Sequence, residues 1–240
     1  MAKGQTIYWH PLPDAAAVAE NAANRILEEA SGSIAQRGIF RLVLAGGRTP
    51  EATYRLLAKA EADWRRWEIF FSDERCLPAG HSDRNSSMAE KAWLDHVNIP
   101  REQIHIIPAE QGPIEGARLY SPKVADALPF DLVVLGLGED GHTASLFPGH
   151  RYPEDTLAIP VTEAPKPPAE RISLSAKALS ETRQVLVLIT GRAKQDVVKK
   201  WKQGKDIPIS KITPSERLDI ILDSEANISV AKKCKQRSNF

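Results

Sequence analysis

Short apolar runs alternate along the chain with longer segments whose apolar residues recur at helical spacing. The runs are mostly apolar and do not alternate with polar residues, which is typical of strands buried on both faces of a parallel sheet. They lie at residues 6–9, 40–44, 68–71, 104–107, 132–135, 185–189 and 218–222. The intervening pattern predicts helices over residues 14–36, 50–62, 85–97 and 192–204. Alternating strands and helices of this kind predict an α/β fold with a mostly parallel sheet covered by helices.

The ends of the predicted helices carry local signals. Asp14 is placed to cap the first helix and Gly38 to end it, while Pro50 is expected at the first position of the second helix. Residues 147–168 contain six prolines and are interpreted as a long irregular connection. We therefore expect a single domain over residues 1–230, followed by a frayed basic tail over residues 231–240.

Charge and composition narrow the classes of function. The net charge is +1, which gives no reason to expect a nucleic-acid partner, and the N-terminal residues lack the apolar stretch of a membrane span. The only cysteines are Cys76 and Cys234, and the histidines show no metal-binding spacing. These features favour a cytoplasmic enzyme or binding protein without a metal.

The loop after residues 40–44 has the composition of a phosphate site. It reads Gly46-Gly47-Arg48-Thr49-Pro50 and leads into a predicted helix. Glycines expose backbone N–H groups, and a helix N-terminus attracts anions. The alternative is an ordinary tight turn in which Thr49 caps the helix.

A charged cluster, Ser72-Asp73-Glu74-Arg75, follows the strand at residues 68–71. Ligands of open parallel sheets bind at the carboxyl ends of the strands, so Asp73 and Arg75 are candidates to face a substrate there. The alternative is a solvated loop with an internal Asp–Arg pair.

The strand at residues 132–135 leads into Gly-Leu-Gly-Glu-Asp-Gly-His, residues 136–142. This matches the G-x-G-x-x-G dinucleotide fingerprint, but Pro148 follows Gly141 too closely for a long helix, and Asp155 is not at a strand end. We expect no nicotinamide cofactor. The loop is instead a glycine-rich turn that presents Asp140 and His142, and His142 is the candidate for proton transfer. Ser145 lacks the G-x-S-x-G context of a nucleophile.

Three stretches together resemble the 6-phosphogluconolactonase family: LAGGRTPEATYRLL, FFSDERCLP and LGLGEDGHTASLFPG. The resemblance implies a single three-layer αβα domain with a Rossmann-like sheet, of the type found in glucosamine-6-phosphate deaminase and ribose-5-phosphate isomerase. It also implies hydrolysis of 6-phosphoglucono-1,5-lactone to 6-phosphogluconate, the second step of the oxidative pentose phosphate pathway, with no cofactor. A monomer or weak oligomer acting on a small sugar-phosphate lactone is expected.

The resemblance also implies roles for individual residues. His142, Asp73 and Arg75 match the family's catalytic positions. Matching positions in substrate or phosphate binding are Gly46, Gly47, Arg48, Thr49, Asn85, Gly141, Arg171 and Lys194. Whether Arg75 serves the phosphate or an oxyanion stays open.

Two positions depart from the family pattern. Arg48 replaces the usual serine of the glycine turn, and Arg84 replaces a serine before Asn85. Two alternative functions are weighed: an isomerase resembling glucosamine-6-phosphate deaminase, and a non-catalytic sugar-phosphate sensor.

Overall fold

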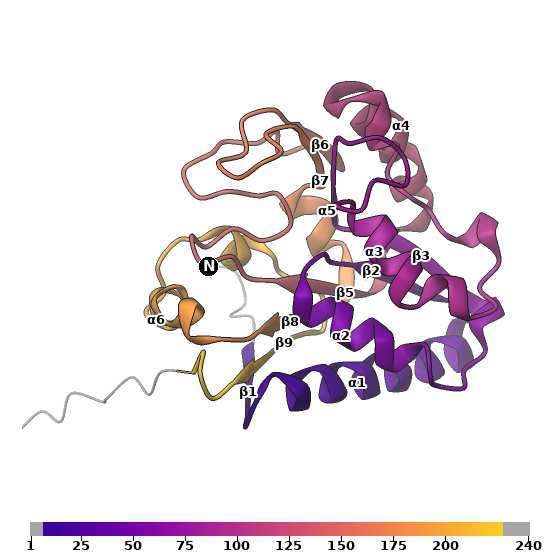
Figure 1. Ribbon diagram of the computed structural model, residues 1–240, viewed down its shortest axis with the longest axis horizontal. Coiled ribbons are helices and arrows are strands. Elements are labelled where there is room, and N and C mark those ends of the chain that lie inside the picture. Colours follow the sequence, from indigo (N-terminus) through magenta and orange to yellow (C-terminus); the bar gives the residue numbers. More distant parts are fainter. Residues whose placement is uncertain (1–6, 228–240) are drawn as a thin grey trace, which may run out of the picture.

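The computed structural model describes residues 7–227, whose largest element is a six-stranded parallel sheet with the order β1-β9-β8-β5-β2-β3 (Figure 1). Its strands are β1 (Ile7–Leu12), β2 (Phe40–Leu44), β3 (Trp67–Phe71), β5 (Phe130–Gly136), β8 (Thr182–Ile189) and β9 (Arg217–Asp223). The parallel sheet is confirmed. The strand predicted at residues 104–107 is wrong, because that segment makes only an isolated bridge from Ile104 to Ile69.

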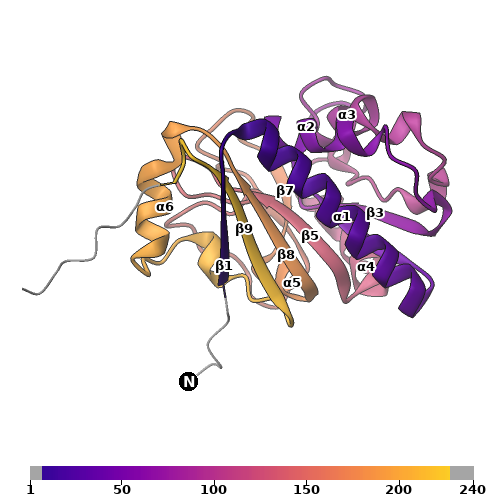
Figure 2. The same ribbon diagram turned by 90° about the horizontal axis from the view of Figure 1, so that it is seen from below.

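The helices on one face of this sheet are α1 (Ala15–Arg37) and α2 (Arg48–Leu57), and α1 runs diagonally across the strands in Figure 2. The predicted signals of α1 are confirmed: the Asp14 carboxylate accepts a hydrogen bond from the Ala17 amide at 2.9 Å, and Gly38 is left-handed with φ of 80°. The prediction for α2 is wrong at both ends. Gly47, not Thr49, is its N-cap, because the glycine turn is tight enough for the helix to begin at Arg48.

The other helices are α3 (Asn85–Ala92), α4 (Pro113–Ala127), α5 (Ala176–Ser180) and α6 (Gln195–Lys202). The predicted helices at residues 85–97 and 192–204 are each a shorter α-helix joined to a 3₁₀ turn. The 3₁₀ turns lie at Trp64–Arg66, Leu94–His96, Arg101–Gln103, Ala109–Gln111, Arg192–Lys194 and Pro208–Lys211. No helix within residues 7–227 is both long and apolar enough to cross a membrane.

A second, antiparallel sheet with the order β4-β7-β6 was not predicted from the sequence. Its strands are β4 (Asp73–Arg75), β7 (Arg171–Leu174) and β6 (Ala158–Val161), and α4 packs against it. The predicted loop at residues 73–75 is therefore a strand, and the proline-rich connection contains β6. Strands of three or four residues are too short to show a period in the sequence. The predicted tail at residues 231–240 lies outside the described residues.

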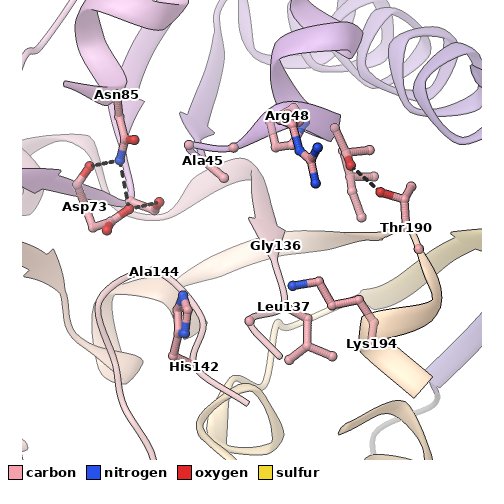
Figure 3. Close-up of a pocket in the computed structure, with 18 of the residues that line it drawn as sticks. Ala45, Arg48, Asp73, Asn85, Gly136, Leu137, His142, Ala144, Thr190 and Lys194 are labelled. Carbon is pink, nitrogen blue, oxygen red and sulfur yellow. Dashed lines mark hydrogen bonds between the residues drawn. The ribbon is translucent and has the colours of Figure 1, made fainter. Parts of the chain in front are cut away.

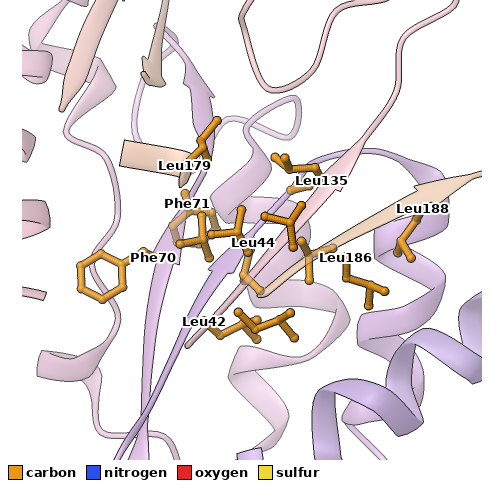
Figure 4. Packing of buried hydrophobic residues seen from close by; sticks show 14 of the residues in the cluster. Leu42, Leu44, Phe70, Phe71, Leu135, Leu179, Leu186 and Leu188 are labelled. Atoms are coloured by element: carbon orange, nitrogen blue, oxygen red, sulfur yellow. The ribbon is translucent and has the colours of Figure 1, made fainter. Parts of the chain in front are cut away.

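The core fills the space between the two sheets and the helices. Leu42, Leu44, Phe71 and Leu135 of the large sheet belong to one cluster with Leu179 of α5, which lies close to Phe71 in Figure 4, and each is almost fully buried. The Tyr120 hydroxyl of α4 accepts a hydrogen bond from the Phe71 amide at 3.0 Å. The carboxyl ends of the strands therefore stand on a close-packed base that fixes the loops above them.

Candidate functional site

A cavity of about 580 Å³ opens at the carboxyl ends of β2, β3, β5 and β8. Of the site residues predicted from the sequence, all but Gly141 line it. They are Gly46, Gly47, Arg48, Thr49, Asp73, Arg75, Asn85, His142, Arg171 and Lys194. Residues from six separate parts of the chain thus meet where ligands of parallel sheets bind.

The turn before α2 forms one wall of this cavity. Gly47 has φ of 110°, a conformation that favours glycine, and the helix starts directly after it. The Thr49 and Thr190 hydroxyls lie 2.7 Å apart and join this turn to the end of β8. The arrangement has the backbone N–H groups and the helix N-terminus that an anion site requires.

Cationic side chains approach the same turn. Arg48 and Lys194 both point into the cavity, Arg48 from the start of α2 and Lys194 from the turn before α6 (Figure 3). Burial lowers the pKa of Lys194. The positive charges of Lys166 and Arg48 lower it further, whereas the negative charge of Glu139 raises it. Positive charges held together in a partly buried place are unfavourable until an anion joins them.

A network of hydrogen bonds fixes Asp73 on the opposite side. The Asn85 amide group donates to the Asp73 backbone carbonyl at 2.9 Å and to the Asp73 carboxylate at 3.2 Å. The hydroxyls of Ser145 and Ser72 donate to the same carboxylate, at 2.6 and 3.2 Å. A carboxylate with this many donors has a defined orientation.

Asn85 is itself fixed by the buried Glu74. The Glu74 carboxylate accepts from the amides of Asn85 and Ser86 at 2.8 and 2.9 Å, and so satisfies free N–H groups at the start of α3. Arg84, 2% exposed, lies 3.4 Å from Glu74 and donates to the Ile107 carbonyl at 2.7 Å. The arginine that departs from the family pattern is therefore a buried structural residue and does not line the cavity.

Two more arginines lie beside each other on the small sheet. Arg75 of β4 is paired in register with Arg171 of β7. Arg75 donates to the Asp83 carbonyl at 2.8 Å, and Arg171 donates to the carbonyls of Lys166, Pro167 and Pro168. Burial lowers the pKa of Arg171, and Arg75 lowers it further while Asp73 opposes both. Like charges directly opposite each other cost free energy, which a bound anion would offset.

His142 is held in place by the preceding residues of its loop. Its Nδ1 lies 2.5 Å from Asp140 Oδ1, and its carbonyl accepts from the Gly138 amide at 2.7 Å. Burial raises the pKa of Asp140, but the charge and hydrogen bonds of His142 outweigh this and lower it overall. No hydrogen bond from the described residues reaches Nε2, and the ring points into the cavity in Figure 3. An imidazole held at Nδ1 with a free Nε2 is suited to accept a proton there.

The glycine next to this pair is required by the position of the ring. A Cβ on Gly138 would lie 2.1 Å from His142 Nδ1 and 2.6 Å from Asp140 Oδ1. Gly141, predicted as a binding residue, instead turns the chain with φ of 99° and is buried behind the cavity. Gly141 is not among the residues that line the cavity, and its role in binding stays a prediction.

Sequence reasoning did not assign roles to Gly138, Thr190, Lys166 and Ser145. Gly138 is visible in the sequence as the middle glycine of the loop, but only the structure shows which side chains occupy the space where its Cβ would lie.

Within residues 7–227, no three His, Cys, Asp or Glu side chains are grouped so that they could hold a metal ion.

Comparison with known proteins identifies the family of the chain. Residues 13–221 match the family model of glucosamine-6-phosphate isomerases/6-phosphogluconolactonase. A 6-phosphogluconolactonase of Synechocystis is 34% identical over 208 residues, 81% of this chain and 86% of the relative. One of Streptomyces coelicolor is 36% identical over 201 residues, 75% of this chain and 77% of the relative.

The fold is also that of a solved 6-phosphogluconolactonase. The crystal structure of the Thermotoga maritima protein superposes with a TM-score of 0.85 and 25% identity, over 91% of this chain and 100% of that one. The chain belongs to the family of glucosamine-6-phosphate isomerases and 6-phosphogluconolactonases.

Proposed function

We propose that this chain hydrolyses 6-phosphoglucono-1,5-lactone to 6-phosphogluconate. The observation that carries the proposal is His142, which is held by Asp140 at Nδ1 and faces a cavity with several cationic side chains in its walls. Each of the curated relatives described above is named 6-phosphogluconolactonase. The substrate's phosphate and the negative charge that develops at its carbonyl both match these cationic walls.

The phosphate is assigned to the turn before α2. Backbone N–H groups at Gly47 and the helix N-terminus supply fixed partial charges, and Arg48 and Lys194 supply full ones. Arg171 belongs with this group because it anchors residues 166–168, and Lys166 of that segment lies close enough to affect Lys194. Binding energy from the phosphate then fixes the lactone ring against His142.

Hydrolysis follows as acyl transfer to water. His142 Nε2 takes one proton from a water molecule while the water oxygen bonds to the lactone carbonyl carbon, which gives a tetrahedral oxyanion. The bond from that carbon to the ring oxygen then breaks, and the ring oxygen receives the proton from the imidazolium. The products are the free carboxylic acid, which ionises, and the open-chain hydroxyl group.

Asp73 and Arg75 are assigned to the reacting end. They lie two residues apart on β4, so their side chains share one face of the small sheet. Arg75 is placed to stabilise the oxyanion, and the fixed carboxylate of Asp73 to orient the attacking water. Asp140 keeps a proton on Nδ1, which leaves Nε2 free as the base.

The test follows the lactone directly. Lactone generated in situ from glucose-6-phosphate would be monitored with no protein, with wild type and with His142→Ala. We expect wild type to accelerate its decay and His142→Ala to lose about 10²- to 10⁴-fold in kcat, with the circular dichroism spectrum unchanged. If wild type does not accelerate the decay of the lactone, the proposed lactonase activity is refuted.

Parallel assays separate the alternatives. Ammonia released from glucosamine-6-phosphate would indicate the deaminase-like isomerase. Binding of 6-phosphogluconate by both wild type and His142→Ala, with neither reaction catalysed, would indicate the sensor. Glucono-1,5-lactone without phosphate is the matched control substrate, and we expect a much higher KM for it.

A further inference from the structure

One buried hydrogen bond joins the loop that carries His142 to the strand that carries Asp73. The Ser145 hydroxyl donates to Asp73 Oδ2 at 2.6 Å, and Ser145 has no solvent exposure. Ser145 does not line the cavity, so its oxygen is not placed to attack a substrate. Nothing in the proposed chemistry uses this residue directly.

The backbone between His142 and Ser145 is tightly constrained. The Thr143 hydroxyl donates to the Gly136 carbonyl at 2.8 Å, and Thr143 and Leu146 bridge each other through their backbones. Between them, Ala144 has φ of 47°, in the left-handed region that non-glycine residues rarely adopt. This turn directs the Ser145 side chain toward β4 while His142 faces the cavity.

Ser145 is also tied to the small sheet through its backbone. Its amide donates to the Ser173 hydroxyl at 3.2 Å, and Ser173 is the residue of β7 that pairs in register with Asp73. The loop from the large sheet is therefore attached at Ser145 to both strands that carry the arginine pair. A short, fully buried bond to a carboxylate is among the stronger hydrogen bonds of a protein.

We propose that Ser145 is a positioning residue that sets the orientation of the Asp73 carboxylate relative to His142. The inference rests on the proposed function, in which Asp73 orients the attacking water and His142 takes its proton. Loss of the hydroxyl leaves Asp73 with its Asn85 and Ser72 donors but frees the carboxylate oxygen that Ser145 holds. The damage should then appear in the chemical step rather than in substrate binding.

The test compares Ser145→Ala with Ser145→Thr, which keeps the hydroxyl, and with Ser87→Ala. Ser87 is a matched control because it is also buried, and its hydroxyl has no hydrogen-bond partner among residues 7–227. We expect Ser145→Ala to lower kcat about tenfold with KM within about twofold, Ser145→Thr to recover most of kcat, and Ser87→Ala to match wild type.

A double-mutant cycle with Asp73→Ala tests the route of the effect. If Ser145 acts through Asp73, adding Ser145→Ala to Asp73→Ala lowers kcat by less than about twofold more. An equal tenfold loss on both backgrounds, or a change confined to KM, would overturn the proposal.

A crystal structure of Ser145→Ala gives a readout independent of turnover. We expect the Asp73 carboxylate to be rotated or disordered there, and a carboxylate that keeps its wild-type position would also overturn the proposal. If wild type does not accelerate lactone decay, the proposed function fails, and the crystal structures alone then decide whether Ser145 orients Asp73.

Discussion

Adding a single methyl group at Gly138 should greatly lower the activity of this protein while changing its stability little. The Cβ of Gly138→Ala would lie 2.1 Å from His142 Nδ1 and 2.3 Å from His142 Cε1, whereas ordinary van der Waals contact begins at 3.4 Å. The ring must therefore move by about 1 Å. The same Cβ would lie 2.6 Å from Asp140 Oδ1, so the hydrogen bond that orients the imidazole is displaced as well.

The stability cost of this change should be small. The atoms that the new methyl group meets belong to two side chains, both partly exposed, and not to backbone. The backbone of Gly138 lies outside the left-handed region, so alanine can adopt it. Catalysis is more sensitive, because a displacement of about 1 Å in a reacting group costs about 10²-fold in rate. We expect kcat about 10²-fold below wild type and a melting temperature within a few degrees of it.

The assay is lactone decay under saturating substrate, together with thermal unfolding followed by circular dichroism. Gly136→Ala is the matched control: it adds the same group two residues earlier, where a Cβ would meet nothing within 4 Å. Because Gly136 lines the cavity, any effect of that control should fall on KM. A Gly138→Ala enzyme with wild-type kcat would refute the placement of His142 as the base.

Three further predictions test other parts of the site. Gly46→Ala would place a Cβ 2.0 Å from the Oδ1 atom of the buried Asn85, so we expect lower kcat and a loss of about 1–3 kcal/mol in unfolding free energy by urea denaturation. Asp140→Asn should lower kcat about 10²-fold or more, because a neutral amide does not fix the proton on Nδ1 as a carboxylate does, and a kcat equal to that of wild type would contradict this. Because burial and nearby cations lower the pKa of Lys194, its charge is lost at a pH below the usual 10.5, and calorimetry should show affinity for 6-phosphogluconate falling as pH rises through that lowered value. Lys194→Arg should remove this alkaline fall, and a fall of equal size in that variant would contradict the assignment.

The acid stability of the His142 loop follows from the Asp140 pKa. The pKa of Asp140 is lowered in the folded protein, so the pair contributes stability above the ordinary value of 3.8 and loses it as pH falls through the lowered value. Asp140→Asn should therefore flatten the acid limb of the stability curve measured by denaturant unfolding between about pH 5 and pH 2. An unchanged acid limb would show that the pair does not persist in solution.

The sequence was most informative where an element has a strong local signal. Apolar runs of five residues, interrupted in β2 only by Arg41, predicted β2 and β8, and Asp14 and Gly38 marked both ends of α1. The three loops that meet at the cavity were predicted because each follows such a strand. Parallel strands bring their carboxyl ends to one edge, so residues far apart in the sequence could be grouped without a structure.

The sequence was least informative where position depends on contacts between distant segments. β4 has three residues, and pairs with β7 about a hundred residues later, so no local period marks it. The N-cap of α2 is Gly47 and not Thr49, because the glycine turn decides where the helix starts and outweighs the preference of threonine for the N-cap position. The close approach of Gly138 to His142 has no signal in composition at all, since a glycine in such a loop has several equally good explanations.

The relation between the two sheets explains how the site is assembled. Ser72 is the residue at which the chain leaves one sheet and enters the other: its amide donates to the Leu44 carbonyl of β2 at 2.8 Å, and its carbonyl accepts from the Leu174 amide of β7 at 2.7 Å. Asp73 and Arg75 follow directly, so the reacting end stands on the small sheet. His142 and the turn before α2 stand on the large one.

In the proposed mechanism, catalysis therefore depends on how two separately hydrogen-bonded sheets are held together. Buried hydrogen bonds cross between them at Ser72 and at Ser145, and on the proposal above they set the orientation of Asp73 toward His142. The phosphate turn needs no such contact, because Gly46, Thr49 and Thr190 all belong to the large sheet and its connections. Substitutions that disturb Asp73 or the junction of the sheets should therefore lower kcat, and Gly46→Ala belongs with them because its Cβ meets Asn85, a hydrogen-bond donor to Asp73. Loss of a side chain that binds only the phosphate should instead raise KM.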